Sequence, residues 1–224
     1  MTRIAYLGPA GTFTEQAARQ FDIAGAEYVP VDSPSAALAA LSGGADYAVC
    51  AIENSIDGAV TATSDALAAT SGVQIVGETE LSIAFAVMTA PGHQLDQATR
   101  LATHPVAYQQ VKCWLSKHAP NAKFVPAASN AAAAQMVADG QADVAVAPER
   151  AAELFGLEVH ATGVADSETA RTRFVLVAKQ GPLPAATGAD RTAVVLRTPN
   201  EPGALVGVLQ EFAARGVDMS RIES

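Results

Sequence analysis

The sequence has few cysteines, few aromatic residues and few charges, and each shortage argues against a class of protein. Its two cysteines, Cys50 and Cys113, lie in apolar surroundings and form no Cys-X-X-Cys pair, so we expect buried free thiols and neither a disulfide nor a metal site. Charged residues make up 17% of the chain and aromatic residues 5%, whereas 50% of the residues are hydrophobic. This composition indicates a globular protein with helices packed closely on a sheet, and not a disordered or coiled-coil chain.

Basic residues are scarce as well. The formal net charge is -9, and no cluster of Lys and Arg alternates with aromatic residues, so we expect no binding to nucleic acid. In so acidic a chain, a binding site for a small anion has to be local. It would be built from helix N-termini and from single Arg or Lys side chains.

The sequence also lacks the features that direct a chain to a membrane. The segment from Met1 to Gly8 reads as a strand and carries neither the apolar region nor the cleavage site of a signal peptide. No apolar run is long enough to span a bilayer. We therefore expect a cytoplasmic protein with no membrane partner.

Short apolar runs alternate with segments of helical periodicity over most of the chain. Capping residues support the helix starts, because Thr12, Ser33 and Ser129 each precede a helical segment. Strands that alternate with helices in this way form βαβ units, which build parallel sheets. The predicted strands cover residues 3–7, 27–31, 47–52, 99–103, 123–127 and 143–147.

Two extended stretches, residues 73–88 and 173–179, break this alternation. They indicate that the chain crosses from one α/β lobe to a second and then returns, with a ligand cleft between the lobes. We expect the first lobe to hold residues 1 to about 77 together with the return near 172–180. The second lobe should hold residues 78 to about 171.

The composition changes again towards the C-terminus. Residues 181–190 are rich in Pro, Gly and Ala and are typical of a linker. Beyond it, residues 192–197 read as a strand, 203–215 as a helix and 217–224 as the approach to another strand. One strand and one helix cannot bury their apolar faces alone, so we expect residues 191–224 to be truncated or to be completed by another subunit.

Short motifs with polar residues lie at the ends of predicted strands, the usual position of ligand sites in α/β proteins. Each motif alone also fits an ordinary turn, helix cap or strand start. None of the four histidines pairs with a Ser, Cys or metal-ligand pattern, so neither a nucleophile nor a metal site is predicted. Arg173 stands out, because an Arg at a lobe junction of an acidic chain suits a carboxylate. The motifs are Gly8-Pro9-Ala10-Gly11-Thr12-Phe13, Ile52-Glu53-Asn54-Ser55, His104-Pro105 with Gln109-Gln110, and Thr172-Arg173-Phe174.

In order and spacing, these motifs resemble those of the prephenate dehydratase family, and the resemblance covers residues 3 to about 180. Two later motifs, Gly203-Ala204-Leu205-Val206 and Arg221-Ile222-Glu223-Ser224, resemble the phenylalanine site of the ACT regulatory domain that usually follows. The resemblance implies a catalytic domain over residues 1–180, with two α/β lobes like those of type II periplasmic binding proteins. It also implies an incomplete α+β, ferredoxin-like ACT domain over residues 191–224.

The resemblance further assigns roles to single residues. The catalytic residues that it implies are Thr172, the key residue, with Asn54, Gln110 and Thr103. The substrate-binding residues are Arg173, Phe174, Ser55, His104, Gly11 and Thr12. The allosteric phenylalanine site would comprise Gly203, Ala204, Leu205, Val206, Glu223 and Ser224. The sequence departs from the family pattern at Ala51, Thr103 and Ala170, where Pro, Ser and Asn are frequent.

The activity implied is that of a carbon-oxygen lyase which converts prephenate to phenylpyruvate in L-phenylalanine biosynthesis, with loss of water and carbon dioxide. The resemblance implies no metal and no organic cofactor, L-phenylalanine as allosteric effector, and a homodimer or homotetramer. Two alternatives stay open. One is arogenate dehydratase, and the other is a non-catalytic amino-acid-binding sensor of the same two-lobed fold.

Overall fold

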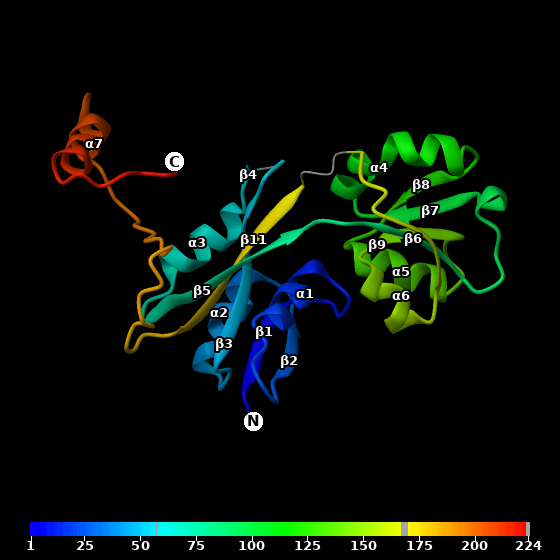
Figure 1. Ribbon diagram of the computed structural model, residues 1–224, viewed down its shortest axis with the longest axis horizontal. Helices are drawn as coiled ribbons and strands as arrows, with labels where there is room; N and C mark the ends of the chain where they lie inside the picture. The colour runs from blue at the N-terminus through cyan, green and yellow to red at the C-terminus, as the bar shows by residue number, and fades with distance from the viewer. Residues whose placement is uncertain (57, 167–169, 223–224) are drawn as a thin grey trace. The chain divides into compact units, whose positions relative to one another are not determined.

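The structure is a computed structural model and describes residues 1–56, 58–166 and 170–222. The chain forms two compact units, Met1–Pro184 and Ala185–Ser224, which are described separately below. The first unit is an α/β unit built on two sheets, each with helices on both faces (Figure 1). We call each sheet with its helices a lobe.

The sheet of the first lobe has the strand order β2-β1-β3-β11-β5, and the short β4 pairs with β3. β1, β2 and β3 run parallel, whereas β11 is antiparallel to both of its neighbours, so the sheet is mixed. The strands are β1 (Arg3–Leu7), β2 (Glu27–Val31), β3 (Tyr47–Asn54), β4 (Gly58–Ala59), β5 (Val73–Ser82) and β11 (Arg171–Lys179). The helices are α1 (Phe13–Gln20), α2 (Pro34–Ser42) and α3 (Thr61–Ala69).

Alternation along the strands places the helices of this lobe on opposite faces of the sheet. Ile4 and Tyr6 of β1 belong to the same buried cluster as Ala17 of α1. Ala5, which lies between them, belongs to a second cluster with Leu38 of α2. α1 therefore covers one face, and α2 covers the other together with α3.

The sheet of the second lobe has the strand order β10-β6-β9-β7-β8. β7 runs parallel to β8 and β9, whereas β6 is antiparallel to β9 and β10. Figure 1 shows α4 on one side of this sheet and α5 with α6 on the other. The strands are β6 (Ala86–Thr89), β7 (Arg100–Thr103), β8 (Lys123–Pro126), β9 (Val144–Ala147) and β10 (Glu158–Thr162). The helices are α4 (Pro105–His118), α5 (Asn130–Ala138), α6 (Glu149–Phe155) and the 3₁₀ turn η1 (Leu95–Gln97).

The core of the second lobe is divided in the same way. Val144 and Val146 of β9 cluster with Val111 of α4, while Ala145 clusters with Ala134 of α5. The valine cluster is continuous with the buried face of the first lobe that α1 covers, since Ile4 and Tyr6 lie in the same cluster. The two lobes therefore share one apolar core where α1 and α4 face their sheets.

The crossings between the lobes differ from the sequence prediction. β5 stays paired with β11 up to Ser82, so the expected division near residue 78 falls inside a strand. The extended stretch 73–88 is two strands, β5 and β6, that belong to different sheets. The return follows β10, which was not predicted because most of its side chains are exposed at the edge of the sheet and show no alternation.

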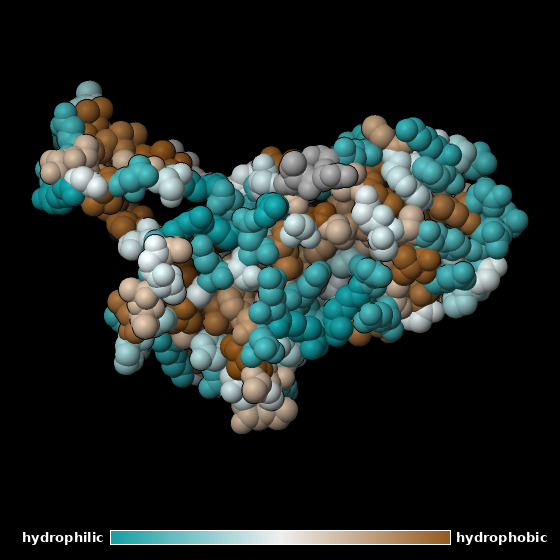
Figure 2. All heavy atoms as spheres, viewed as in Figure 1, coloured by the Kyte–Doolittle hydropathy of each residue, from teal (hydrophilic) through white to brown (hydrophobic). Residues whose placement is uncertain are grey.

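Over residues 185–222, the second unit contains one helix, α7 (Ala204–Ala214), which begins after Gly203 at a positive φ of 86°. No side chain of α7 is buried, and Leu205 and Val206 are 53% and 54% exposed. Hydrophobic residues accordingly show at the surface of this unit (Figure 2).

Within residues 185–222 the predicted strand 192–197 is not formed, because these residues offer no second strand to complete its hydrogen bonds. The expected strand was therefore wrong for the chain as described. Glu223 and Ser224 lie outside the described residues, so the ACT-like fold of this unit stays a prediction.

Candidate active site

A cavity of about 180 Å³ lies between the first and the second lobe. The first lobe contributes side chains of α1, β3 and β11, and the second lobe contributes the start of α4 and the first residue of α5. The lining residues are Phe13, Thr14, Ala51, Asn54, Ile83, Phe85, His104, Val106, Ala107, Gln110, Asn130, Thr172 and Phe174.

Asn54 and Thr172 form one polar wall of this cavity. They are paired directly in the register of β3 and β11, and Asn54 Nδ2 donates a hydrogen bond to Thr172 Oγ1 over 3.3 Å. The amide is held in this orientation because the N–H of Ile56 donates to Asn54 Oδ1 over 2.8 Å. Since Thr172 Oγ1 accepts from Asn54, its own proton is left to donate to a bound molecule.

Phe174 lies on the same face of β11 as Thr172, whereas Arg173 lies on the other face. The Arg173 guanidinium pairs with Glu53 of β3 at 3.0 Å and with Glu78 of β5 at 3.2 Å. Its side chain is 19% exposed and does not line the cavity. The substrate-anchoring role of Arg173 therefore stays a prediction, and the geometry gives this residue another function, which is to join three strands.

Gln110 enters the cavity from α4. Its Oε1 atom is buried and has no hydrogen-bond partner among the residues that the structure describes. Asp166 fixes the helix at this point, because its N–H donates to the Gln110 carbonyl over 2.6 Å and its carboxylate accepts from the N–H groups of Cys113 and Trp114. An unpaired buried amide oxygen costs about 1–3 kcal/mol, so a ligand that donates to Gln110 would be stabilised here.

His104 and Thr103 lie at the junction of β7 and α4, but only His104 lines the cavity. Thr103 is fully buried, and its Oγ1 donates to the Val146 carbonyl over 2.8 Å, so its contacts support the sheet. A catalytic role of Thr103 stays a prediction. His104 caps α4, since its Nδ1 accepts from the N–H of Val106 over 3.3 Å. The neutral ring then carries its proton on Nε2, where it can donate.

Gly11, Thr12 and Ser55 do not line the cavity, and hydrogen bonds within the protein engage all three. Gly11 N–H donates to Glu15 Oε2 over 2.6 Å, and Thr12 Oγ1 caps α1 by accepting from the N–H of Glu15 over 3.3 Å. Ser55 Oγ accepts from the N–H of Arg171 over 2.9 Å. Their substrate-binding roles stay predictions.

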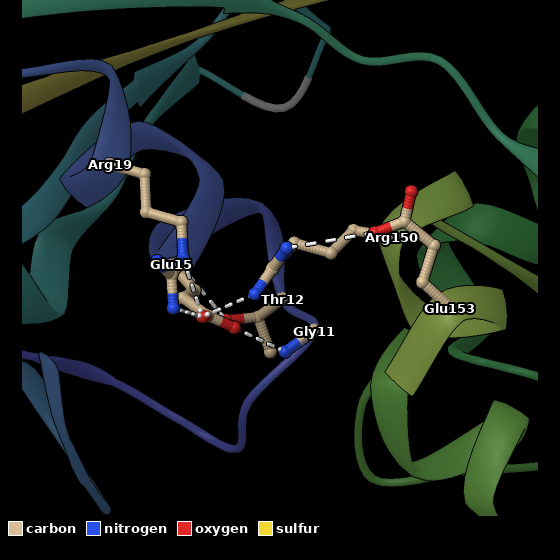
Figure 3. A network of polar contacts seen from close by, with 6 residues as sticks. All are labelled: Gly11, Thr12, Glu15, Arg19, Arg150 and Glu153. Carbon is tan, nitrogen blue, oxygen red and sulfur yellow. Dashed lines mark hydrogen bonds and ion pairs between the residues drawn. The ribbon is translucent and has the colours of Figure 1, made fainter. Parts of the chain in front are cut away.

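The buried carboxylate of Glu15 on α1 connects the two lobes through Arg150 of α6 (Figure 3). Its Oε1 lies 2.7 Å from Arg19 Nη2 within α1 and 3.4 Å from Arg150 Nη2 of α6. Burial raises the pKa of Glu15, but the Gly11 N–H and the two guanidinium groups outweigh burial and hold the pKa below its ordinary value of 4.5. Glycine is favoured at position 11, because φ is +86° and a Cβ atom would lie 3.1 Å from Leu154 Cδ1 of the second lobe, which would have to move.

Several residues that line the cavity were not predicted from the sequence. Phe85 and Ile83 lie where the chain crosses between the lobes, and Phe85 packs edge-on against Phe13 with ring centroids 5.6 Å apart. A single crossing segment has no periodicity that would reveal it. Asn130 had a signal, because it follows β8 as His104 follows β7, and parallel strands bring such residues to one edge of the sheet.

The described residues contain no group of three or more His, Cys, Asp or Glu side chains that could hold a metal ion. Over that part of the chain, no helix has the length and apolar character needed to cross a membrane. Cys50 and Cys113 are free thiols, as predicted, but only Cys50 is buried, and Cys113 is exposed, contrary to the prediction. Burial raises the pKa of Cys50 to about 12.

Known proteins resemble this chain over its whole length. The family model of prephenate dehydratase matches residues 4–182. A prephenate dehydratase of Corynebacterium glutamicum is 54% identical over 230 residues, a match that covers 100% of this chain and 73% of that protein. The structure of a prephenate dehydratase from Arthrobacter aurescens in complex with L-Phe is 41% identical with a TM-score of 0.93, covering 100% of this chain and 76% of that one. The structure of GqqA, described as a novel type of quorum quenching acylase, is 32% identical with a TM-score of 0.78, and the match covers 99% of this chain and 81% of that one.

Proposed function

The chain belongs to the prephenate dehydratase family, and we propose that its cavity converts prephenate to phenylpyruvate in L-phenylalanine biosynthesis. The main observation in support is the Asn54–Thr172 pair at the cavity wall. Because Thr172 Oγ1 accepts from Asn54, the Thr172 hydroxyl can donate its own proton to a substrate. Gln110 and His104 complete the polar lining.

The reaction needs little from the protein except position and hydrogen bonds. The ring carboxylate leaves as carbon dioxide, its bonding electrons enter the ring, and the ring carbon-oxygen bond breaks. The departing hydroxyl takes up one proton and leaves as water, and the product ring is aromatic, which supplies the driving force. We assign Thr172 as the donor to the departing oxygen, because a positioned donor of this kind contributes about 10² to 10⁴ in rate.

The remaining lining residues bind and enclose the substrate. The first turn of α4 presents Val106 and Ala107 to the cavity, and a helix N-terminus favours a negatively charged group such as a carboxylate. The Nε2–H of His104 can donate to the same group. Phe13 and Phe174 supply apolar walls that limit water around the developing charge.

The lining also supports prephenate over arogenate as the substrate. Arogenate carries an ammonium group where prephenate carries a keto group, and an ammonium group in a cavity requires a carboxylate or several acceptors. The described residues that line the cavity include no Asp and no Glu. We therefore favour prephenate as the substrate.

An assay with both substrates tests this function. The purified protein, incubated with prephenate, should form phenylpyruvate with no added metal or cofactor, and its kcat/KM for prephenate should exceed that for arogenate. Faster turnover of arogenate would contradict the assignment of the substrate. Failure to turn over either compound would contradict the assignment of the activity.

We propose that the wider features of the family apply to this chain too. These are two lobes of the type II periplasmic-binding-protein kind around the active site, a partial ACT domain over residues 191–224, a homo-oligomer and a cytoplasmic location. L-Phenylalanine is the proposed allosteric effector, and the Arthrobacter aurescens relative in complex with L-Phe supports it. Gly203, Ala204, Leu205 and Val206 would contribute the helix side of the effector site. Glu223 and Ser224, the other residues proposed for this site, lie outside the described residues.

Phenylalanine should therefore inhibit a form extended to the length of the relatives, and should hardly inhibit a form that ends at Ser224. The physical reason is that an effector acts only through contacts that differ between two states, and loss of part of its site removes most of a coupling of about 1–3 kcal/mol. The measurement is a titration of phenylalanine against both forms in one prephenate assay. Equal inhibition of the two forms would place the effector in the catalytic cavity instead.

A further inference from the structure

Asn130, the first residue of α5, lines the cavity beside His104. The N–H of His104 donates to Asn130 Oδ1 over 3.2 Å, and the Thr103 hydroxyl lies 3.3 Å from the same oxygen. A backbone N–H can only donate, so the atom that faces it has to be the amide oxygen. The orientation of the Asn130 amide is fixed by this contact.

The NH₂ group of Asn130 can donate hydrogen bonds to a ligand, because the amide oxygen accepts from His104. Among the residues that the structure describes, none accepts a hydrogen bond from Asn130 Nδ2, whereas the His104 N–H donates to its Oδ1. This group lies on the same wall as His104 and as Val106 and Ala107 in the first turn of α4. The wall therefore offers several donors and no carboxylate, which is the arrangement that binds an anion.

The chemistry of the reaction decides which carboxylate of the substrate should bind here. The ring carboxylate loses its negative charge as carbon dioxide forms, so a strong donor on it would stabilise the ground state more than the transition state. The carboxylate of the pyruvoyl side chain keeps its charge throughout. A wall of donors is therefore compatible with turnover when it holds the side-chain carboxylate.

We propose that Asn130 is a substrate-binding residue, and that its Nδ2 group donates to the pyruvoyl carboxylate of the substrate alongside His104. This inference rests on the proposed dehydratase function and deepens it. Asn130 would contribute to binding equally in the ground state and in the transition state. Its loss should therefore appear in KM and leave kcat nearly unchanged.

Asn130→Asp is the decisive variant, with Asn130→Ala as its matched comparison. The aspartate keeps an oxygen for the His104 N–H and suits a helix N-terminus, but it replaces the donor with a negative charge. We expect Asn130→Asp to raise KM at least about tenfold, more than Asn130→Ala does, and kcat to stay within about threefold of wild type. The KM of Asn130→Asp should also fall as the pH is lowered and the new carboxylate is protonated, unlike that of Asn130→Ala.

Binding of phenylpyruvate, which keeps the pyruvoyl side chain and lacks the ring carboxylate, identifies the group that Asn130 contacts. Its dissociation constant, measured by calorimetry without turnover, should rise in Asn130→Asp by about the same factor as KM. A near-normal KM for Asn130→Asp beside an impaired Asn130→Ala would overturn the proposal, because Asn130 would then serve only as the acceptor for His104. A raised KM with unchanged phenylpyruvate binding would also overturn it.

Binding of phenylpyruvate and turnover of prephenate are separate properties of the protein, so failure of one is distinguishable from failure of the other. If wild-type protein bound phenylpyruvate through Asn130 but did not consume prephenate, the proposed activity would be contradicted and the proposed carboxylate site would be retained. Thermal unfolding of both variants shows whether they fold. If Asn130→Asp does not fold, phenylpyruvate binding is measured with Asn130→Ala, which introduces no charge. Its dissociation constant should exceed that of the wild type.

Discussion

Replacement of Thr172 by Val should lower kcat for prephenate at least about 10²-fold while the protein stays folded. Valine keeps the branched shape that suits β11 and loses only the hydroxyl, whose proton is left to donate at the cavity wall. The departing hydroxyl of the substrate then has no donor at this position. The measurement is kcat from steady-state kinetics, with the midpoint of thermal unfolding as the check on folding.

Thr172→Ser is the matched control for this prediction. It keeps a hydroxyl that can accept from Asn54 and donate to the substrate, so it should retain most of the wild-type kcat. If Thr172→Val kept a near-normal kcat in a folded protein, Thr172 would have only a structural role in pairing β11 with β3. Equal losses in the valine and serine variants would indicate a packing effect and not the loss of a proton donor.

The sequence motifs lie at strand ends that border the cavity, but a motif does not show which of its residues face the cavity. Asn54, His104, Gln110 and Thr172 were all expected in the site, and all four line the cavity. Arg173 is adjacent to Thr172 in the sequence and therefore faces the opposite side of β11, where it meets Glu53 and Glu78. A sequence motif alone does not show which of its residues share a face. Once the motif is placed on a strand, the period of two assigns alternate residues to opposite faces.

The fold was predictable where local patterns agree with tertiary contacts. Residues 3–7 and 27–31 were expected to be strands and are β1 and β2. Each precedes a helix with a clear N-cap, Thr12 or Ser33, so local signals on both sides of the turn agree with the fold. β10 was not predictable, since it is an edge strand whose side chains are mostly exposed. Residues 192–197 have the apolar pattern of a strand but do not form one. An apolar pattern forms a strand only beside a partner strand, which the sequence pattern does not reveal.

Glu15→Gln should lower the free energy of unfolding by about 1–3 kcal/mol at neutral pH. The Glu15 side chain is 3% exposed and accepts from the Gly11 N–H, from Arg19 and from Arg150, so its charge is used by three donors at once. Glutamine keeps the size and one acceptor but removes the charge that both guanidinium groups face. The contact between α1 and α6 across the lobes should weaken, and chemical denaturation of both proteins at several pH values measures the loss.

The pH dependence tests the cause of this loss. The pKa of Glu15 is lower in the folded protein than its ordinary value of 4.5, so its stabilising effect is complete above that value and disappears as the pH falls through the folded-state pKa. The difference between wild type and Glu15→Gln should therefore be largest near neutral pH and shrink in acid. Glu153→Gln is the matched control, because Glu153 also contacts Arg150, at 3.7 Å, but is 74% exposed, and its loss should change stability by less than about 0.5 kcal/mol. A difference for Glu15→Gln that stayed constant from neutral to acidic pH would show that packing and not charge holds this contact.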